Sequence, residues 1–137
     1  MLITRRVEFS SSHVCRNPQL SEEENLRLYG PAANLHGHGH NYALEVTLRG
    51  EVNPTTGMIY DLKDLKDVMM SEVVEPMDHR HLNHEVPPFD RVIPTTENIA
   101  VEIWRRMEKH FSDGPARLHS VRLFETEDTW VELIEAK

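Results

Sequence analysis

A run of seven residues, 36–42 (HGHGHNY), constrains this chain more than any other stretch of its sequence. Its three histidines occupy alternate positions and are separated only by glycine. In an extended chain, residues two apart point to the same face, so His38 and His40 can be directed at one point. Glycine between them allows the backbone to approach that point closely. The run therefore predicts two imidazoles aimed at a common centre.

Neutral imidazole is a usual ligand of zinc, and three protein ligands with one open position are typical of a catalytic zinc site. The alternatives are a polar His/Gly loop without metal and an accidental metal-affinity patch. His13, at the end of an expected strand, is a separate source of imidazole that can complete the set of three. We therefore expect this chain to bind a metal ion.

Length, charge and cysteine content limit the classes of protein to which the chain can belong. Its 137 residues predict one domain, spanning 1–137. A net charge of −8 argues against a nucleic-acid partner, since such binding depends on neutralising phosphates. No apolar stretch is long enough to span a membrane, and residues 1–6 do not resemble a signal peptide. The single cysteine, Cys15, excludes an internal disulfide and fits a reducing cytoplasm.

Apolar periodicity and turn residues predict an α+β fold. The order strand, strand, helix, helix, strand, strand favours an antiparallel four-stranded sheet with two helices on one face. The exposed edges of so small a sheet invite pairing with other subunits. The expected strands cover residues 2–9, 42–49, 118–126 and 129–134, and the expected helices cover 21–28 (short), 62–74 and 95–111.

A second polar concentration, residues 78–84 (DHRHLNH), follows the helix that Pro76 is expected to close. Asp78 and His79 can form a carboxylate–imidazole pair if the chain bends between them, and the alternative is a polar loop at a helix end. Glu125 lies near a strand end beside a turn, where an exposed acid is the simplest interpretation.

Six short motifs occur in the order seen in the 6-pyruvoyltetrahydropterin synthases, a family that also contains the 6-carboxytetrahydropterin synthases of the queuosine pathway. The resemblance extends from Val7 to Ile134 and implies the tunnelling fold. In that fold, protomers join their sheets into barrels, commonly as a hexamer of two trimers with active sites between subunits. The motifs are FSSSH at 9–13, HGHNY at 38–42, TGM at 56–58, DH at 78–79, TTEN at 95–98 and FET at 124–126.

The resemblance also implies roles for residues that match the family's functional positions. His36 precedes the matched histidine pair, and we interpret it as a neighbour of the metal site or as an alternative ligand. By this resemblance the zinc ligands are His13, His38 and His40, the pterin anchor is Glu125 with supporting contacts from Thr95, Thr96 and Glu97, and two members of a catalytic triad are Asp78 and His79.

The third triad member of the family is a cysteine a few residues before the His-x-His pair, and Ala32 stands at that position here. Alanine cannot transfer a proton. The residues leave three explanations open: an engineered Cys-to-Ala change, a natural variant with altered or lost activity, and replacement of the thiol by Cys15. A small buried hydrophobic role is the simpler interpretation of Cys15.

By resemblance, the expected activity is that of a zinc-dependent synthase or lyase acting on dihydroneopterin triphosphate, a small-molecule pterin substrate. The product is 6-carboxytetrahydropterin or 6-pyruvoyltetrahydropterin; we favour the 6-carboxy product, although the residues do not separate the two. The alternative function is a catalytically inactive paralogue that binds pterin or zinc.

Overall fold

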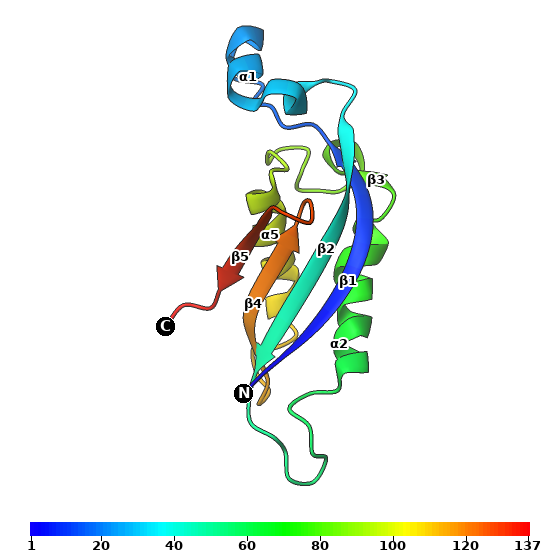
Figure 1. Ribbon diagram of the computed structural model, residues 1–137, viewed down its shortest axis with the longest axis vertical. Helices are drawn as coiled ribbons and strands as arrows, with labels where there is room; N and C mark the ends of the chain where they lie inside the picture. Colours follow the sequence, from blue (N-terminus) through cyan, green and yellow to red (C-terminus); the bar gives the residue numbers. More distant parts are fainter.

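The computed structural model describes all residues, 1–137, and consists of one five-stranded sheet with helices packed on one face (Figure 1). The spatial order of the strands is β3-β1-β2-β4-β5. Helices α2 and α5 cover the same face of the sheet, and the other face carries no helix (Figure 1). The strands are β1 Leu2–His13, β2 His38–Arg49, β3 Arg80–His81, β4 Arg117–Phe124 and β5 Trp130–Ile134.

The three expected helices are present, but the second one ends later than expected and a short helix, α4, lies in the polar segment 78–84, where none was expected. Asp61 caps α2 by accepting a hydrogen bond from the Lys63 N–H, as the sequence suggested. The helix then continues past Met69 through a π-helical turn and α3, so Pro76 lies inside it rather than closing it. The helices are α1 Glu22–Tyr29, α2 Leu62–Met69, α3 Glu75–Met77, α4 Leu82–Glu85 and α5 Thr96–Glu108, with a 3-10 turn at Gly30–Ala33 and a π turn at Met70–Val74.

The sheet has five strands and is mixed, which corrects the expected four-stranded antiparallel sheet. The additional strand, β3, has two residues and runs parallel to β1, with Ser11 opposite Arg80 and Ser12 opposite His81. Two polar residues carry no apolar alternation, so the sequence pattern could not reveal β3. The pairing depends on contacts 69 residues apart in the chain.

β1 and β2 are both longer than their apolar patterns predicted. The expected strands ended at Phe9 and began at Tyr42, whereas β1 continues to His13 and β2 begins at His38. The additional residues are Ser, His, Gly and Asn, which show no apolar alternation but pair with each other across the two strands. His13 lies opposite His38 in this antiparallel register. The strand extension therefore brings the predicted histidines together.

The core lies between the sheet and helices α2 and α5 and contains 23 buried residues. On β2, Leu44, Val46 and Leu48 are fully buried on the helix-covered face. The short helix α1 begins with the predicted capping box at Ser21 and, with the 3-10 turn, projects beyond one end of the sheet (Figure 1). No helix in the structure combines the length and apolarity needed to cross a membrane.

Candidate metal centre

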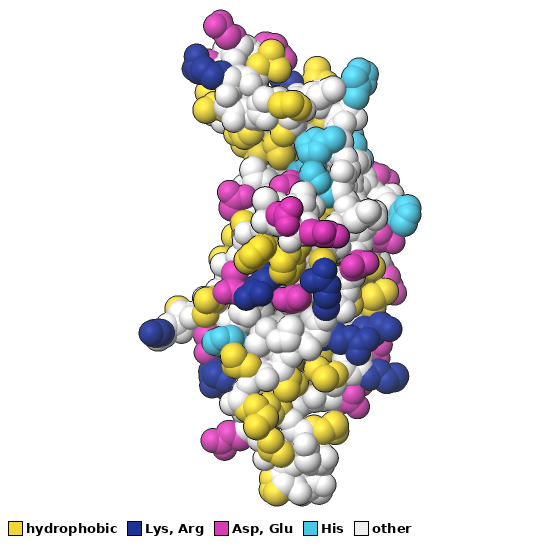
Figure 2. Space-filling view, in the orientation of Figure 1, with side chains coloured by type: hydrophobic (Ala, Val, Ile, Leu, Met, Phe, Trp, Pro, Cys, Tyr) yellow, Lys and Arg dark blue, Asp and Glu magenta, His cyan; other side chains and the backbone are white.

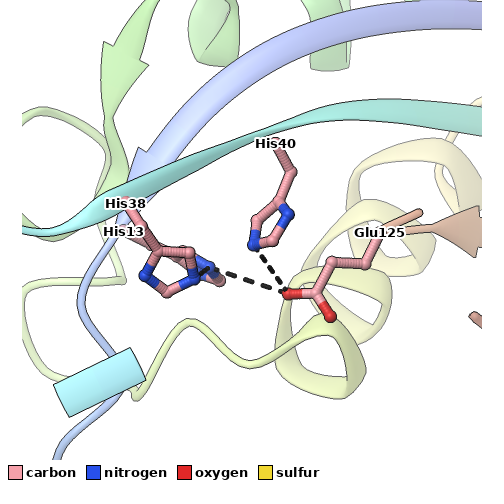
Figure 3. A group of neighbouring side chains, drawn as sticks. All are labelled: His13, His38, His40 and Glu125. Carbon is pink, nitrogen blue, oxygen red and sulfur yellow. Dashed lines mark hydrogen bonds and ion pairs between the residues drawn. The ribbon is translucent and has the colours of Figure 1, made fainter. Parts of the chain in front are cut away.

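Strand alternation brings four potential metal ligands together at one end of the sheet (Figure 3). His38 and His40 share a face of β2, and His13 is paired directly with His38. Glu125 follows β4, whose last residue, Phe124, pairs with Ala43 of β2. Phe124 and Ala43 point to the face opposite that of His38 and His40, so the next residue, Glu125, points to the same face as the histidines. All four side chains therefore lie on the helix-covered face, beyond the end of the packed core.

The distances in this group suit a small cation. The Nε2 atoms of His13 and His38 are 3.1 Å apart. Glu125 Oε1 lies 3.2 Å from His40 Nε2 and 3.7 Å from His13 Nε2, and one ligand atom from each of the four residues falls within 4.8 Å of the others. Tetrahedral zinc with Zn–N bonds of about 2.0–2.1 Å separates its ligand atoms by roughly 3.3 Å. Although Glu125 Oε1 is close to the buried Nε2 of His40, the two atoms do not form a hydrogen bond, so this nitrogen is free to bind a metal.

Two of the three histidines, His13 and His40, are biased toward the neutral form that a metal requires. Burial lowers the pKa of His13, and nearby His38 and His40 lower it further. Burial is also the main cause that lowers the pKa of His40, against the opposing effect of Glu125. On the far side of its ring, His13 donates its Nδ1–H to the carbonyl of Pro94 over 2.7 Å. That bond leaves the lone pair on Nε2, which faces the group.

These shifts predict that the metal-free protein loses stability on mild acidification. A histidine whose pKa is lowered by folding binds its proton more readily in the unfolded chain, so its contribution to stability is lost as pH falls below about 6.5. We expect the free energy of unfolding after EDTA treatment to decrease from pH 7.5 to 5.5, by at most about 1.4 kcal/mol per pH unit for each histidine. Urea titrations would measure it, and His13→Asn should flatten the slope. An equal slope in both proteins would contradict this origin.

Asp78 and His79 form the predicted carboxylate–imidazole pair. His79 Nδ1 lies 2.9 Å from Asp78 Oδ2, and a φ of 58° at His79 provides the required bend. The other carboxylate oxygen of Asp78 accepts the Ser10 N–H over 2.8 Å. The bond from Ser10 is the largest of the causes that lower the pKa of Asp78, followed by the bond to His79. The acid is therefore ionised at neutral pH and fixes the imidazole.

His79 itself is not one of the four residues of the metal group in its own chain. Its side chain is 83% exposed. It lines a polar pocket with Ser10, Ser12 and Asn41, and His40 of the metal group also borders this pocket. The structure therefore brings His13, His38, His40 and Glu125 together but leaves His79 outside this group.

A groove of about 1050 Å³ extends from the metal group. His40 and Glu125 line one part of it, and Phe124, Thr126 and Asp78 line others. Figure 2 shows histidine side chains gathered at this end of the molecule, below the projecting α1, with acidic side chains beside them. The metal group is therefore open to a ligand of moderate size.

Residues 2–136 match the family model described as 6-pyruvoyl tetrahydropterin synthase. The chain belongs to this family. It is 45% identical to the 6-pyruvoyl tetrahydrobiopterin synthase of Pongo abelii over 129 residues, or 94% of this chain and 88% of the relative. The solved structure of Caenorhabditis elegans 6-pyruvoyl tetrahydropterin synthase matches with a TM-score of 0.91 and 37% identity, covering 99% of this chain and 96% of that one. A putative 6-carboxy-5,6,7,8-tetrahydropterin synthase of Archaeoglobus fulgidus is 36% identical over 96 residues, or 70% of this chain and 74% of the relative.

The α+β architecture agrees with the tunnelling fold expected for this pterin synthase family. Glu125, expected as a pterin anchor, lies within ligand distance of the metal group, which the sequence did not predict. The period-2 alternation of β4 contains the signal, because Leu123 is buried in the core and Glu125 is the next residue on that face. His36, by contrast, is exposed and does not belong to the group.

The start of α5 carries the family motif at 95–98 and is tied to the metal group through Pro94. The Thr95 hydroxyl caps the helix by accepting the Asn98 N–H over 3.2 Å. Thr96 is buried and Glu97 is exposed. Because Pro94 accepts the hydrogen bond of His13, the three residues expected to support a pterin follow directly after the segment that orients a metal ligand.

Ala32, where the resemblance led us to expect a reactive cysteine, lies in the 3-10 turn beside the strand of His13. Its carbonyl accepts the Cys15 N–H over 2.8 Å. The Cys15 thiol lies 3.7 Å from His13 Nδ1, on the side of the ring that faces away from the metal group. Burial, with smaller effects from Glu125 and Glu97, raises the pKa of Cys15 to about 11. This geometry disfavours the explanation in which Cys15 replaces the missing thiol.

We expect the Cys15 thiol to be unreactive in the folded protein. A pKa of about 11 leaves roughly 200-fold less thiolate at pH 8 than an unperturbed thiol with a pKa of about 8.5. Alkylation by iodoacetamide, followed by mass spectrometry, should therefore be at least about 100-fold slower in the native protein than in guanidinium-unfolded chain. Equal rates in the two states would show instead that Cys15 is an accessible, activated thiol.

Proposed function

We propose that this protein is a zinc-dependent tetrahydropterin synthase that acts on dihydroneopterin triphosphate. The observation that carries the proposal is the convergence of three imidazoles and a carboxylate, two of which, His40 and Glu125, line a groove, in a chain of this family. Three histidines and an oxygen donor are a ligand set that zinc accepts in catalytic sites.

His13, His38 and His40 would hold the zinc ion, and Glu125 would bind the pterin ring. Zinc, when bound, supplies Lewis acidity toward a substrate hydroxyl. A carboxylate can accept two parallel N–H bonds from the amino group and ring N–H of a pterin, much as it does from a guanidinium. A groove of about 1050 Å³ is at the upper end of the usual range for small-molecule sites, about 300–1000 Å³.

Proton transfer is assigned to His79, which Asp78 orients. An imidazole has two ring nitrogens and can both accept and donate a proton during a reaction. Because His79 is exposed and lies outside the metal group of its own chain, we assign it to the site of a neighbouring copy. Active sites would then lie between subunits of a homo-oligomer, a hexamer of two trimers as in the family resemblance.

The outermost strand, β5, supports such an assembly. It pairs with β4 on one side only, and its Trp130 and Ile134 side chains are more than half exposed. An exposed edge with large apolar side chains is a ready surface for pairing with another chain. Sedimentation equilibrium would measure the resulting mass.

The comparisons shift our preference between the two products toward 6-pyruvoyltetrahydropterin. Identity to the Pongo abelii 6-pyruvoyl enzyme is 45% over 129 residues, against 36% over 96 residues for the putative 6-carboxy enzyme. A place in queuosine biosynthesis would follow only from the 6-carboxy product.

Product analysis tests this function directly. The zinc-loaded protein is incubated with dihydroneopterin triphosphate and reductant, and the pterins are separated and identified by mass spectrometry. Release of inorganic triphosphate with either tetrahydropterin supports the proposal and identifies the product. Pterin binding without turnover would favour the second candidate, an inactive binding paralogue, for which Ala32 is the specific observation.

A further inference from the structure

The segment 78–83 lies along the end of β1 that carries the ligand His13. The His79 N–H donates to the Ser10 carbonyl over 2.6 Å. Arg80 and His81 then continue as β3, parallel to β1. On the side of β3, backbone pairing therefore extends along β1 as far as Ser12, one residue before the ligand His13.

Beyond that point a side chain takes over the pairing. The Oδ1 of Asn83 accepts the Val14 N–H over 2.8 Å, and its Nδ2 donates to the Val14 carbonyl over 2.9 Å. Asn83 lies in α4, where the backbone has turned away from β1. A side-chain amide offers the same donor and acceptor as a peptide group. The Asn83 side chain therefore makes the two hydrogen bonds to Val14 that a further residue of β3 would make.

Val14 lies directly between His13 and Cys15, whose N–H is bound to Ala32. The same segment also reaches the second strand of the centre. A Cβ placed on Gly37, the residue before His38, would lie 3.0 Å from His81 Nε2. The contacts of 78–83 therefore restrain the backbone next to His13, and His81 lies close to the residue that precedes His38.

We propose that Asn83 is a positioning residue of the metal centre, which fixes the backbone at Val14 and thereby the direction of the His13 imidazole. The inference rests on the metal-dependent function proposed above. Groups that orient a ligand without touching the metal typically change metal affinity by about 10–100-fold. Asn83 acts in this way through the main chain.

The chain offers a matched control for this role. Asn25 forms the same two-bond pairing with the backbone of Asn17, at 2.8 and 2.9 Å, and is fully buried. It belongs to α1 and contacts none of the four residues of the metal group. Asn→Asp at either site keeps the size and the acceptor but sets a second oxygen against a carbonyl.

The experiment measures the zinc dissociation constant of the full chain by competition with a chromophoric chelator, and the visible spectrum of the cobalt-loaded protein. We expect Asn83→Asp to weaken zinc binding by about 10–100-fold and to alter the cobalt bands. Asn25→Asp should lower the unfolding temperature and leave both metal readouts within about twofold of wild type.

Wild-type zinc affinity and cobalt spectrum in Asn83→Asp would overturn the inference, as would equal weakening in Asn25→Asp. Should Asn83→Asp not fold, Asn83→Ser removes both bonds without adding a charge, and unchanged zinc affinity there overturns the inference equally. A wild-type protein that binds no zinc would remove the proposed function together with the inference. The results for the Asn83 and Asn25 variants would overturn the inference alone and leave the proposed function intact. Failure of the inference can therefore be distinguished from failure of the proposed function.

Discussion

Replacement of His13 by alanine is expected to weaken zinc binding by about two orders of magnitude and to abolish turnover. Structural zinc sites with four ligands bind with about 10–16 kcal/mol, so one ligand contributes roughly 3 kcal/mol, or about 100-fold in affinity. The effect should not be smaller at His13, which is 1% exposed and fixed by Pro94, so no other side chain can take its place. Chelator competition and product analysis on the same preparation would measure both losses.

The control for this prediction comes from the same histidine-rich run. His36 is exposed and lies outside the metal group, although it is only two residues from His38. His36→Ala should therefore retain wild-type zinc affinity and turnover. If both variants lost affinity equally, the run would bind metal as an unstructured patch rather than through the converging set.

The convergence of the imidazoles could be predicted because it depends on local geometry. Side chains two residues apart on a strand point to the same face, so the His-Gly-His spacing alone predicted that His38 and His40 share a face. The adjacent Asp78 and His79 likewise needed only one bend, which the structure provides at His79. Helix caps at Ser21 and Asp61 were visible for the same reason.

The features that could not be predicted all depend on contacts between distant parts of the chain. The hydrogen bond from His13 to Pro94 spans 81 residues, and no local sequence pattern predicts it. β3 exists because residues near Asp78 bond to Ser10, 68 positions away. Glu125 could be predicted as a fourth potential ligand only from the register of β4 against β2, and this register depends on the packing of the whole sheet.

Ala32→Cys is expected to increase the turnover of dihydroneopterin triphosphate by about 10²–10⁴-fold, the usual contribution of a positioned acid–base group. The half-buried Ala32 lies beside the strand of His13, with its carbonyl bound to Cys15. A thiol there would lie in the segment where the family resemblance places a reactive cysteine, and a nearby metal ion or protonated histidine would favour its thiolate form. Initial rates of triphosphate release at equal zinc occupancy would measure the gain.

Two control variants separate proton transfer from other effects of the new side chain. Ala32→Ser has nearly the same size but a hydroxyl that stays protonated at neutral pH, so it should remain at the rate of the unaltered chain. Because Cys15 is hydrogen-bonded to Ala32, the cysteine variant is also made in a Cys15→Ala background, where a disulfide between the two positions cannot form. A gain that persists in this background and is absent in Ala32→Ser identifies the thiol as the missing proton carrier. Equal rates in all three variants would mean that His79 and Asp78 carry the proton transfers without a third group.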